Sequence, residues 1–274
     1  MLNRLLSLAL GLSAWAFSAG LASAIETPDL SKPKRIYTGP EYTLGLDIWY
    51  LNNNGHMQLE GGQKIVIPRD AELGEGSNVY PVFFQVRRIG PFIPNFRLHS
   101  YRYRYASGLK YTENTRFGGV TYSPGSRVSL DVYAIGLLAF YTANPLNSVE
   151  VQYGFELRRF GGEVGLTGED ANLRSPRELK YDITGEVISY LPLAHVGATY
   201  RLTNPALHFT LEGEALKISD YAYYDGRAMV RYQLFGLMIG AGYRHSFFGG
   251  KIELDESSVG MHAKGTFFRV SYSL

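Results

Sequence analysis

The chain has 274 residues and a formal charge of +2 at neutral pH, from 27 Lys and Arg against 25 Asp and Glu. This balance leaves no large positive field that would favour nucleic acid as a partner. The absence of cysteine excludes disulfide frameworks, thiolate nucleophiles and Cys-ligated metal sites. Charged residues make up only 19%, below the roughly 25% of soluble domains, while Tyr, Phe and Gly are abundant.

The first 24 residues have the pattern of a secretory signal. Arg4 precedes an apolar stretch at 5–12, and Ala22-Ser23-Ala24 forms a small-residue cleavage site. An uncleaved membrane anchor is the alternative, but the apolar part is shorter than the ~20 residues that a spanning helix needs. We therefore expect a signal peptide at 1–24, a periplasmic segment at 25–41 and one further domain at 42–274.

Strand-sized segments with a period of two follow along the domain at 42–274. In 148–158 the odd positions are apolar and the even positions are small or charged, and 207–215, 226–234 and 268–274 repeat this alternation. Ten strands are predicted, at 42–51, 79–89, 96–107, 128–143, 148–160, 183–202, 207–218, 224–234, 237–248 and 259–274. Twelve strands are possible if 116–122 forms its own strand, and eight if the weaker segments are loops.

The predicted connections alternate between short and long. The short turns are at 91–95, 144–147, 203–206 and 235–236. The longer polar stretches are 52–77, 108–127, 161–181, 219–223 and 249–258. A transmembrane barrel of the Gram-negative outer membrane sorts its connections in this way. The sequence thus predicts an all-β fold, a closed antiparallel transmembrane β-barrel of about ten strands in the cell outer membrane, with a soluble periplasmic β-protein as the alternative.

Two predicted strands break the alternation. In 96–105 the apolar face changes sides after Leu98, which requires either a bulge or a strand that leaves the membrane. Pro192 lies within the predicted strand 183–202, where it cannot donate a ladder hydrogen bond. A bulge or an early strand end is expected there.

Several short motifs resemble a known family. They are Gly45, Asp47, Trp49 and Tyr50 in an early strand, the segments 90–98 and 117–122, and a late series at 212–213, 224–226 and 242–244. With a signal peptide and a mature length of about 250 residues, they resemble one group of Gram-negative outer-membrane β-barrels, a family with a Gly-Gly feature and no assigned activity. The resemblance implies fold and location and supplies no catalytic residues.

The end of the chain also matches such barrels. Alternating outward residues precede a final Leu where these barrels more often end in Phe. The resemblance implies that this C-terminal signal is recognised by the barrel-assembly machinery. Its residues are Phe268, Val270, Tyr272 and Leu274.

If the apolar faces contact lipid, side chains of both charges point into the lumen. The expected lumen charge network comprises Asp47, Arg87, Glu150, Glu156, Arg158, Arg201, Glu212, Glu214, Arg227, Arg231, Arg244 and Arg269, with Gln85, Gln152 and His195 on the same face. The interior of a ten-stranded barrel is little wider than its side chains, so opposite charges should pair across it and plug it. Arg231 is expected to pair with Glu212 or Glu156.

Signs of catalysis are weak. His99-Ser100 and His245-Ser246 are adjacent, but neighbours in a strand point to opposite faces and cannot share a proton without a bulge. A protease-type site would need the carboxylates Glu253, Asp255 and Glu256 with His262, but a solvated charged loop is by far the better explanation for them. Neither Glu72 with Glu75 nor Glu169 with Asp170 has metal-ligand spacing.

The sequence favours a structural or loop-mediated interaction role over two alternatives, a narrow porin-like channel for ions or small solutes and an outer-membrane hydrolase. The loops at 52–77 and 161–181 are the expected contact surfaces. The expected partners are outer-membrane lipid, lipopolysaccharide and the barrel-assembly machinery, and neither nucleic acid nor a cofactor is expected.

Overall fold

The computed structural model describes residues 39–58, 64–67, 77–90, 92–117, 120–182, 190–202, 204, 206–218, 221–252 and 257–274. The chain divides into two units, 1–39 and 40–274, and the description below concerns the second. The expected signal peptide and nearly all of the segment 25–41 lie outside the described residues. Within those residues, no helix has the length and apolar character needed to cross a membrane.

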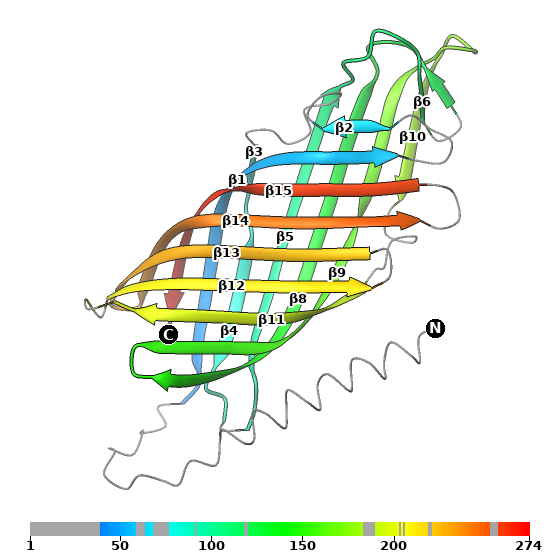
Figure 1. Ribbon diagram of the computed structural model, residues 1–274. Helices are drawn as coiled ribbons and strands as arrows, with labels where there is room; N and C mark the ends of the chain where they lie inside the picture. Colours follow the sequence, from blue (N-terminus) through cyan, green and yellow to red (C-terminus); the bar gives the residue numbers. More distant parts are fainter. Residues whose placement is uncertain are drawn as a thin grey trace, which may run out of the picture. The chain divides into compact units, whose positions relative to one another are not determined.

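Ten antiparallel strands form a closed barrel (Figure 1). In ring order they are β1 (Glu41–Gln58), β4 (Val82–Arg87), β5 (Asn95–Gly108), β8 (Arg127–Leu146), β9 (Val149–Asp170), β11 (Tyr190–Arg201), β12 (Leu207–Ile218), β13 (Tyr221–Leu234), β14 (Leu237–Ile252) and β15 (Ser257–Ser273). The ring closes where β15 pairs with β1, for example at Asp47 and Arg269. All ten predicted strands are confirmed, and the barrel has neither eight nor twelve.

Five shorter strands lie outside this ring, namely β2 (Ile65–Ile67), β3 (Ser77–Val79), β6 (Thr115–Phe117), β7 (Val120–Tyr122) and β10 (Ser175–Asp182). β2 and β3 pair with β1, and β10 pairs with the far part of β9. β6 and β7 pair with each other in a small hairpin, so the segment 116–122 adds no strand to the barrel.

The two ends of the barrel have different connections. At the end where β1 begins and β15 finishes, here called the terminal end, β8, β11 and β13 each join the next ring strand through six residues or fewer. At the opposite loop end, β1 and β4 are joined through residues 59–81 and β5 and β8 through 109–126. For these connections the sorting follows the predicted alternation, whereas three other connections at the loop end differ from the prediction.

Three predicted long loops are largely strand. Ile218 pairs with Tyr221, so only two residues join β12 and β13. Most of 161–181 forms the hairpin of β9 with β10, and most of 249–258 belongs to β14 and β15. In β9, for example, Glu163 and Thr167 are exposed while Val164 and Leu166 are buried, and such a one-sided polar pattern is compatible with a ladder.

Both irregular segments are accommodated without a bulge. β5 pairs with β8 in one continuous register, from Asn95 opposite Phe140 to Gly108 opposite Arg127. Pro192 is the third residue of β11 and faces Leu157 of β9, whereas pairing with β12 starts only at Ala194. Proline therefore sits at a strand start with a partner on one side, where its missing N–H is tolerated.

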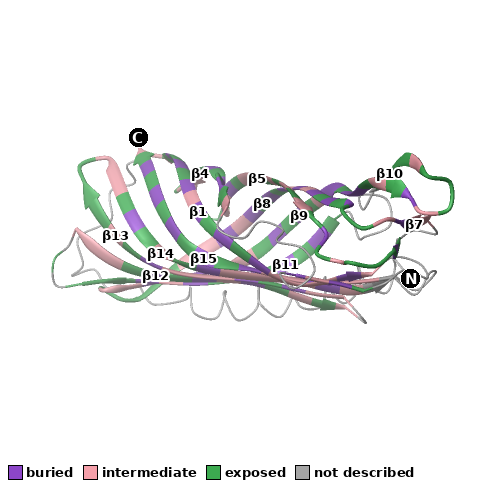
Figure 2. Cartoon of the chain, turned by 90° about the horizontal axis from the view of Figure 1, so that it is seen from above, coloured by how far each residue is buried: buried purple, intermediate pink, exposed green. Residues whose placement is uncertain are grey.

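The membrane-type surface of the barrel is an exterior apolar belt. Exposed and buried residues alternate along the ring strands, as Figure 2 shows. The belt includes Leu44, Phe84, Leu98, Ile135, Leu137, Leu157, Val196, Leu211, Val230, Ile239, Phe268 and Val270. Exposed tyrosines accompany it, namely Tyr42, Tyr50, Tyr80, Tyr200, Tyr232 and Tyr272. An apolar exterior around a polar interior is the pattern of a membrane-spanning β-barrel.

Towards the loop end, this pattern inverts along the same strands. On β5, the outward residue Leu98 is followed by outward Arg102 and Arg104, while the inward side becomes tyrosine. On β8, Val128 and Leu130 are almost fully buried. These residues belong to an apolar cluster, the loop-end core, which comprises Met57, Ile65, Ile67, Leu109, Tyr122, Val128, Leu130, Val132, Val164 and Leu166. The position in β5 where the apolar residues change from one face to the other thus marks where the strand leaves the belt.

Candidate functional site

Ion pairs fill the lumen at the level of the belt. Near the terminal end, Nη2 of Arg87 lies 2.7 Å from Oε1 of Glu150, and Gln152 donates to the same carboxylate at 3.1 Å. Arg87 is on β4 and Glu150 on β9, with β5 and β8 between them in the ring. This first pair therefore reaches across the lumen.

A second level of pairs lies further inside. Arg269 donates through Nε and Nη2 to both oxygens of Asp47, at 2.6 and 2.7 Å. Arg97 donates to both oxygens of Glu212, at 3.1 and 3.2 Å, and Arg227 binds the same carboxylate. Because β8, β9 and β11 separate β5 from β12 in the ring, the pair of Arg97 and Glu212 bridges the barrel.

Arg158 is the centre of a third level and is only 1% exposed. It binds Glu156 and the hydroxyl of Tyr223, and its Nη1 lies 3.2 Å from Oδ2 of Asp225. Its Nη2 is 3.7 Å from Glu214. One guanidinium thus neutralises carboxylates from three different strands, β9, β12 and β13.

Aromatic rings and a second arginine complete this level. Nε of Arg244 donates to Asp225 at 3.0 Å, and its guanidinium lies 4.5 Å from the Trp49 ring centre and 5.2 Å from that of Tyr101. His195 contacts Glu214 at 3.0 Å. These contacts compensate for the desolvation of the buried charges.

Little free space remains among these charges. The gap bounded by Asp47, Arg97, Arg158, Arg227 and other side chains has a volume of about 10 Å³. A single water molecule needs about 10–15 Å³ on this measure. This gap therefore holds at most about one water molecule.

The lumen network expected from the sequence is largely assembled, with two exceptions. Arg201 is exposed at the terminal end of β11. Arg231 donates to Oγ1 of Thr199 at 3.3 Å, and within the described part of the chain it pairs with neither Glu212 nor Glu156. That pairing prediction was wrong, because Arg97 and Arg227 already occupy Glu212.

Four members of the network were not predicted from the sequence, namely Arg97, His99, Tyr223 and Asp225. Arg97 and His99 lie in the segment 96–105, where the apolar face changes sides, so the face of each was not predicted. Asp225 stands two residues before Arg227 and therefore shares its face, a signal that could have identified it. Tyr223 joins through its hydroxyl, which alternation alone does not predict.

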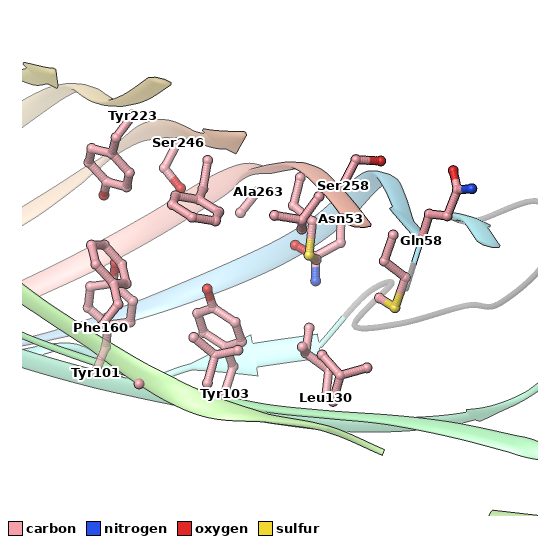
Figure 3. Close-up of a pocket in the computed structure, with 17 residues that line it drawn as sticks. Asn53, Gln58, Tyr101, Tyr103, Leu130, Phe160, Tyr223, Ser246, Ser258 and Ala263 are labelled. Atoms are coloured by element: carbon pink, nitrogen blue, oxygen red, sulfur yellow. The ribbon is translucent and has the colours of Figure 1, made fainter. Parts of the chain in front are cut away.

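An apolar chamber lies between the charged lumen and the loop end. Its volume is about 100 Å³, and its lining includes Tyr103, Leu130, Val132, Phe160 and Val164 on one side. Figure 3 shows Tyr101, Phe160 and Tyr223 at one end of the chamber and Gln58 and Ser258 at the other. The chamber therefore extends from the charged lumen towards the loop end.

The suggested catalytic pairs are separated by the strand geometry. His99 lies 3.3 Å from Glu156 in the lumen, whereas Ser100 follows it on the outward face of β5. His245 is on the outward face of β14, 3.2 Å from His262, and Ser246 lines the chamber. Neither serine shares a face with its neighbouring histidine.

The other acidic groups considered as sites are only partly within the described residues. Glu72, Glu75, Glu253, Asp255 and Glu256 lie outside them. Asp170 accepts hydrogen bonds from the backbone N–H groups of Asn172 and Leu173, at 2.9 and 3.2 Å, so it stabilises the β9–β10 turn. Among the described residues, no group of three or more His, Asp or Glu is placed to hold a metal ion.

The C-terminal residues point away from the lumen. The side chains of Phe268, Val270, Tyr272 and Leu274 are between 48% and 79% exposed. The backbone of Leu274 exchanges hydrogen bonds with that of Tyr42, at 2.8 and 3.2 Å. The final residue is thus held in the sheet beside β1.

No protein-family model and no curated protein sequence matches the chain. Similar solved structures include the outer-membrane protease OmpT of Escherichia coli, with 7% identity, coverage of 85% of this chain and 97% of that one, and a TM-score of 0.48. Ail of Yersinia pestis has 9% identity, coverage of 85% and 99%, and a TM-score of 0.34. The translocator domain of NalP from Neisseria meningitidis has 14% identity, coverage of 96% and 97%, and a TM-score of 0.39.

These neighbours are all outer-membrane barrels, but none of their TM-scores reaches 0.5. The barrel assignment therefore rests on the strand pairing of this chain. The resemblance to a family with a Gly-Gly feature stays a prediction, and Gly118 and Gly119 lie outside the described residues.

Proposed function

We propose that the protein is a non-conducting β-barrel of the outer membrane that acts through its loop end. The observation that carries this proposal is the pair of Arg97 and Glu212, which joins opposite walls of the lumen through two hydrogen bonds. A pore at this level would require this pair to separate and would leave Arg97 without its carboxylate partner in a poorly solvated interior, which is strongly unfavourable. A narrow channel is the alternative, and it would need a gap larger than the residual space of about 10 Å³.

Location and orientation follow from the belt and the connections. The exterior apolar belt fits a bilayer, and short turns in outer-membrane barrels face the periplasm while longer loops face outside. We therefore place the terminal end in the periplasm and the loop end outside. Export by the segment 1–24 is part of the proposal.

Three partners are proposed. Membrane lipid contacts the apolar belt, and lipopolysaccharide head groups contact its outer boundary, where Arg102 and Arg104 face outward beside Asp131. The barrel-assembly machinery recognises the outward residues Phe268, Val270, Tyr272 and Leu274. Beyond the belt, the β9–β10 hairpin offers a surface for contacts with the cell exterior.

A non-enzymatic role is proposed because the possible catalytic groups are used otherwise. His99 and Glu156 contact each other within the charged lumen. His245 stacks on His262 outside the barrel, with ring centres 5.5 Å apart. Hydrolysis that depends on Ser100 or Ser246 would contradict this part of the proposal.

The test is conductance of the purified full chain in planar bilayers. We expect no steady current from protein whose insertion is verified by its heat-dependent mobility on gels. Removing the bridge in the double variant Arg97→Ala/Glu212→Ala should give measurable openings. A matched double variant outside the lumen, Arg102→Ala/Asp131→Ala, should stay silent. Steady ohmic steps from the unaltered chain would overturn the proposal.

A further inference from the structure

The apolar chamber has no part in the closure of the lumen. Its accessible lining is overwhelmingly carbon, from Leu130, Val132, Val164, Met261 and several aromatic rings. The charged lumen adjoins its inner end, the floor of the chamber, so the chamber is a pocket closed at that end rather than a section of a channel. A lining of this kind favours a ligand that is neutral and apolar.

The polar groups at the floor are already occupied. The hydroxyl of Tyr223 binds Arg158 and Asp225, so this side chain offers its ring to the chamber. Tyr223 and Phe160 have ring centres 5.4 Å apart, and Phe160 and Phe248 lie 6.1 Å apart. A molecule that reaches the floor therefore meets aromatic carbon and not charge.

Tyrosine rings on the inward face of β5 form part of one wall. Tyr101 and Tyr103 line the chamber, and Tyr105 follows them on the same face of the strand. Neighbouring ring centres in this series lie 6.0 Å apart, with interplanar angles of 14° and 23°. A planar aromatic molecule can pack against such rings in an offset or edge-to-face arrangement, which contributes about 0.5–1.5 kcal/mol per pair beyond apolar burial.

The volume restricts the size of the ligand. A buried apolar cavity of about 150 Å³ remains dry and binds benzene, because water needs two to four polar partners that such a cavity lacks. At about 100 Å³, the enclosed part of the chamber has the size of one small aromatic ring.

We infer that the chamber binds a small, neutral, single-ring aromatic molecule that enters from the loop end. Gln58 and Ser258, at the outer end of the chamber, form its more polar rim. Because the ion-paired lumen lies below, the molecule is held and does not pass through. This inference goes beyond the proposed function, since binding requires the chamber and not a particular role for the loops.

The test uses fluorobenzene and ¹⁹F NMR with the full chain in phosphatidylcholine nanodiscs. Free, lipid-dissolved and protein-bound fluorobenzene are resolved by comparison with empty nanodiscs. We expect a protein-dependent resonance that saturates at one equivalent. Ala263→Phe places a ring in the chamber and should weaken this binding at least tenfold. Ala241→Phe makes the same change on the lipid-facing side of β14 and should leave it unaltered.

A second variant that fills the chamber controls for misfolding of Ala263→Phe. Ser246→Phe enters the chamber from β14 instead of β15, and heat-dependent gel mobility reports whether each variant folds. Loss of the resonance in a folded filling variant, with retention in Ala241→Phe, supports the inference. A signal in the unaltered chain that matches empty nanodiscs, or one that survives in both filling variants, overturns it. Competition by octanoic acid but not by toluene would also overturn it, because the occupant would then be an acyl chain.

Discussion

The belt-level barrel and the loop-end core use the same strands with opposite faces. At the belt, β8 presents Ile135 and Leu137 outward, about half exposed, and buries Leu138 towards the lumen. Beyond the belt, the same strand presents Ser129 and Asp131 outward and buries apolar side chains inward. No register shift separates the two parts.

The difference teaches that the surrounding solvent sets the polarity of each face. In lipid, the exterior must be apolar, and the polar side chains gather inside as paired charges. In water, the apolar side chains return to the interior and form an ordinary core. The chamber lies where the two arrangements meet, which explains why an apolar cavity adjoins the charged lumen.

The largest expected effect comes from breaking the charged interior. Arg158→Met leaves Glu156, Glu214 and Asp225 without their central cation, so the free energy of unfolding should fall by about 3–5 kcal/mol. Urea titration of the barrel in detergent, followed by heat-dependent gel mobility, measures this. Arg159→Met alters the next residue, which faces outward over Tyr190, and should cost less than about 1 kcal/mol. Equal losses of unfolding free energy in the two variants would show that Arg158 is not the central cation of this level.

A second prediction moves one charge along the outer face of β8. Leu137→Arg places a cation near the middle of the belt and should cost about 2–4 kcal/mol. Ser129→Arg places the same side chain beyond the belt and should change stability by less than about 0.5 kcal/mol. The two variants are compared by urea unfolding in lipid vesicles. If both had the same small effect, the apolar belt would not contact lipid.

The fold was predictable because alternation is a local signal. Each residue of a ring strand faces either lipid or lumen, so the ten strands and most of the lumen charges could be predicted from the alternation of odd and even positions. The pairs across the barrel could not be predicted in this way, because Arg97 and Glu212 are far apart in the sequence and meet only after the barrel closes. Arg231 illustrates the limit, because its face was predicted correctly and its partner was not.

The loop end was harder to predict for a related reason. The inversion of faces makes strand residues beyond the belt resemble polar loops, as in 161–181. The role of β2 and β10 is understood only once β2 is seen to pair with β1 and β10 with β9. The chamber depends on this arrangement, so no pattern in the sequence indicated it.

A third prediction separates the stability of the two regions. Leu166 is fully buried in the loop-end core, and Leu166→Ala should remove about 2–5 kcal/mol of local packing. Because the extension can open while the ring remains closed, urea resistance of the barrel should change by less than about 1 kcal/mol. Limited proteolysis within residues 161–182 should accelerate at least tenfold. Thr167→Ala, its outward neighbour, is the control, and a loss of barrel stability as large as the local loss would show one cooperative unit.

The smallest effect concerns the charged outer face beyond the belt. Asp131 accepts hydrogen bonds from Arg102 at 2.7 Å and from Arg104 at 2.8 Å, and the pKa of Asp131 is lowered, chiefly by the bond from Arg102. Because the folded pKa lies below the ordinary value of about 3.9, the stabilisation is complete at neutral pH and is lost as the pH falls through the folded pKa. Asp131→Asn should cost less than about 1 kcal/mol at pH 7, less in high salt, and nothing in strong acid. Glu163→Gln on the neighbouring strand is the control in the same urea titrations. A loss comparable to that of Arg158→Met would mean that water does not surround this face, and the contrast between the two regions would fail.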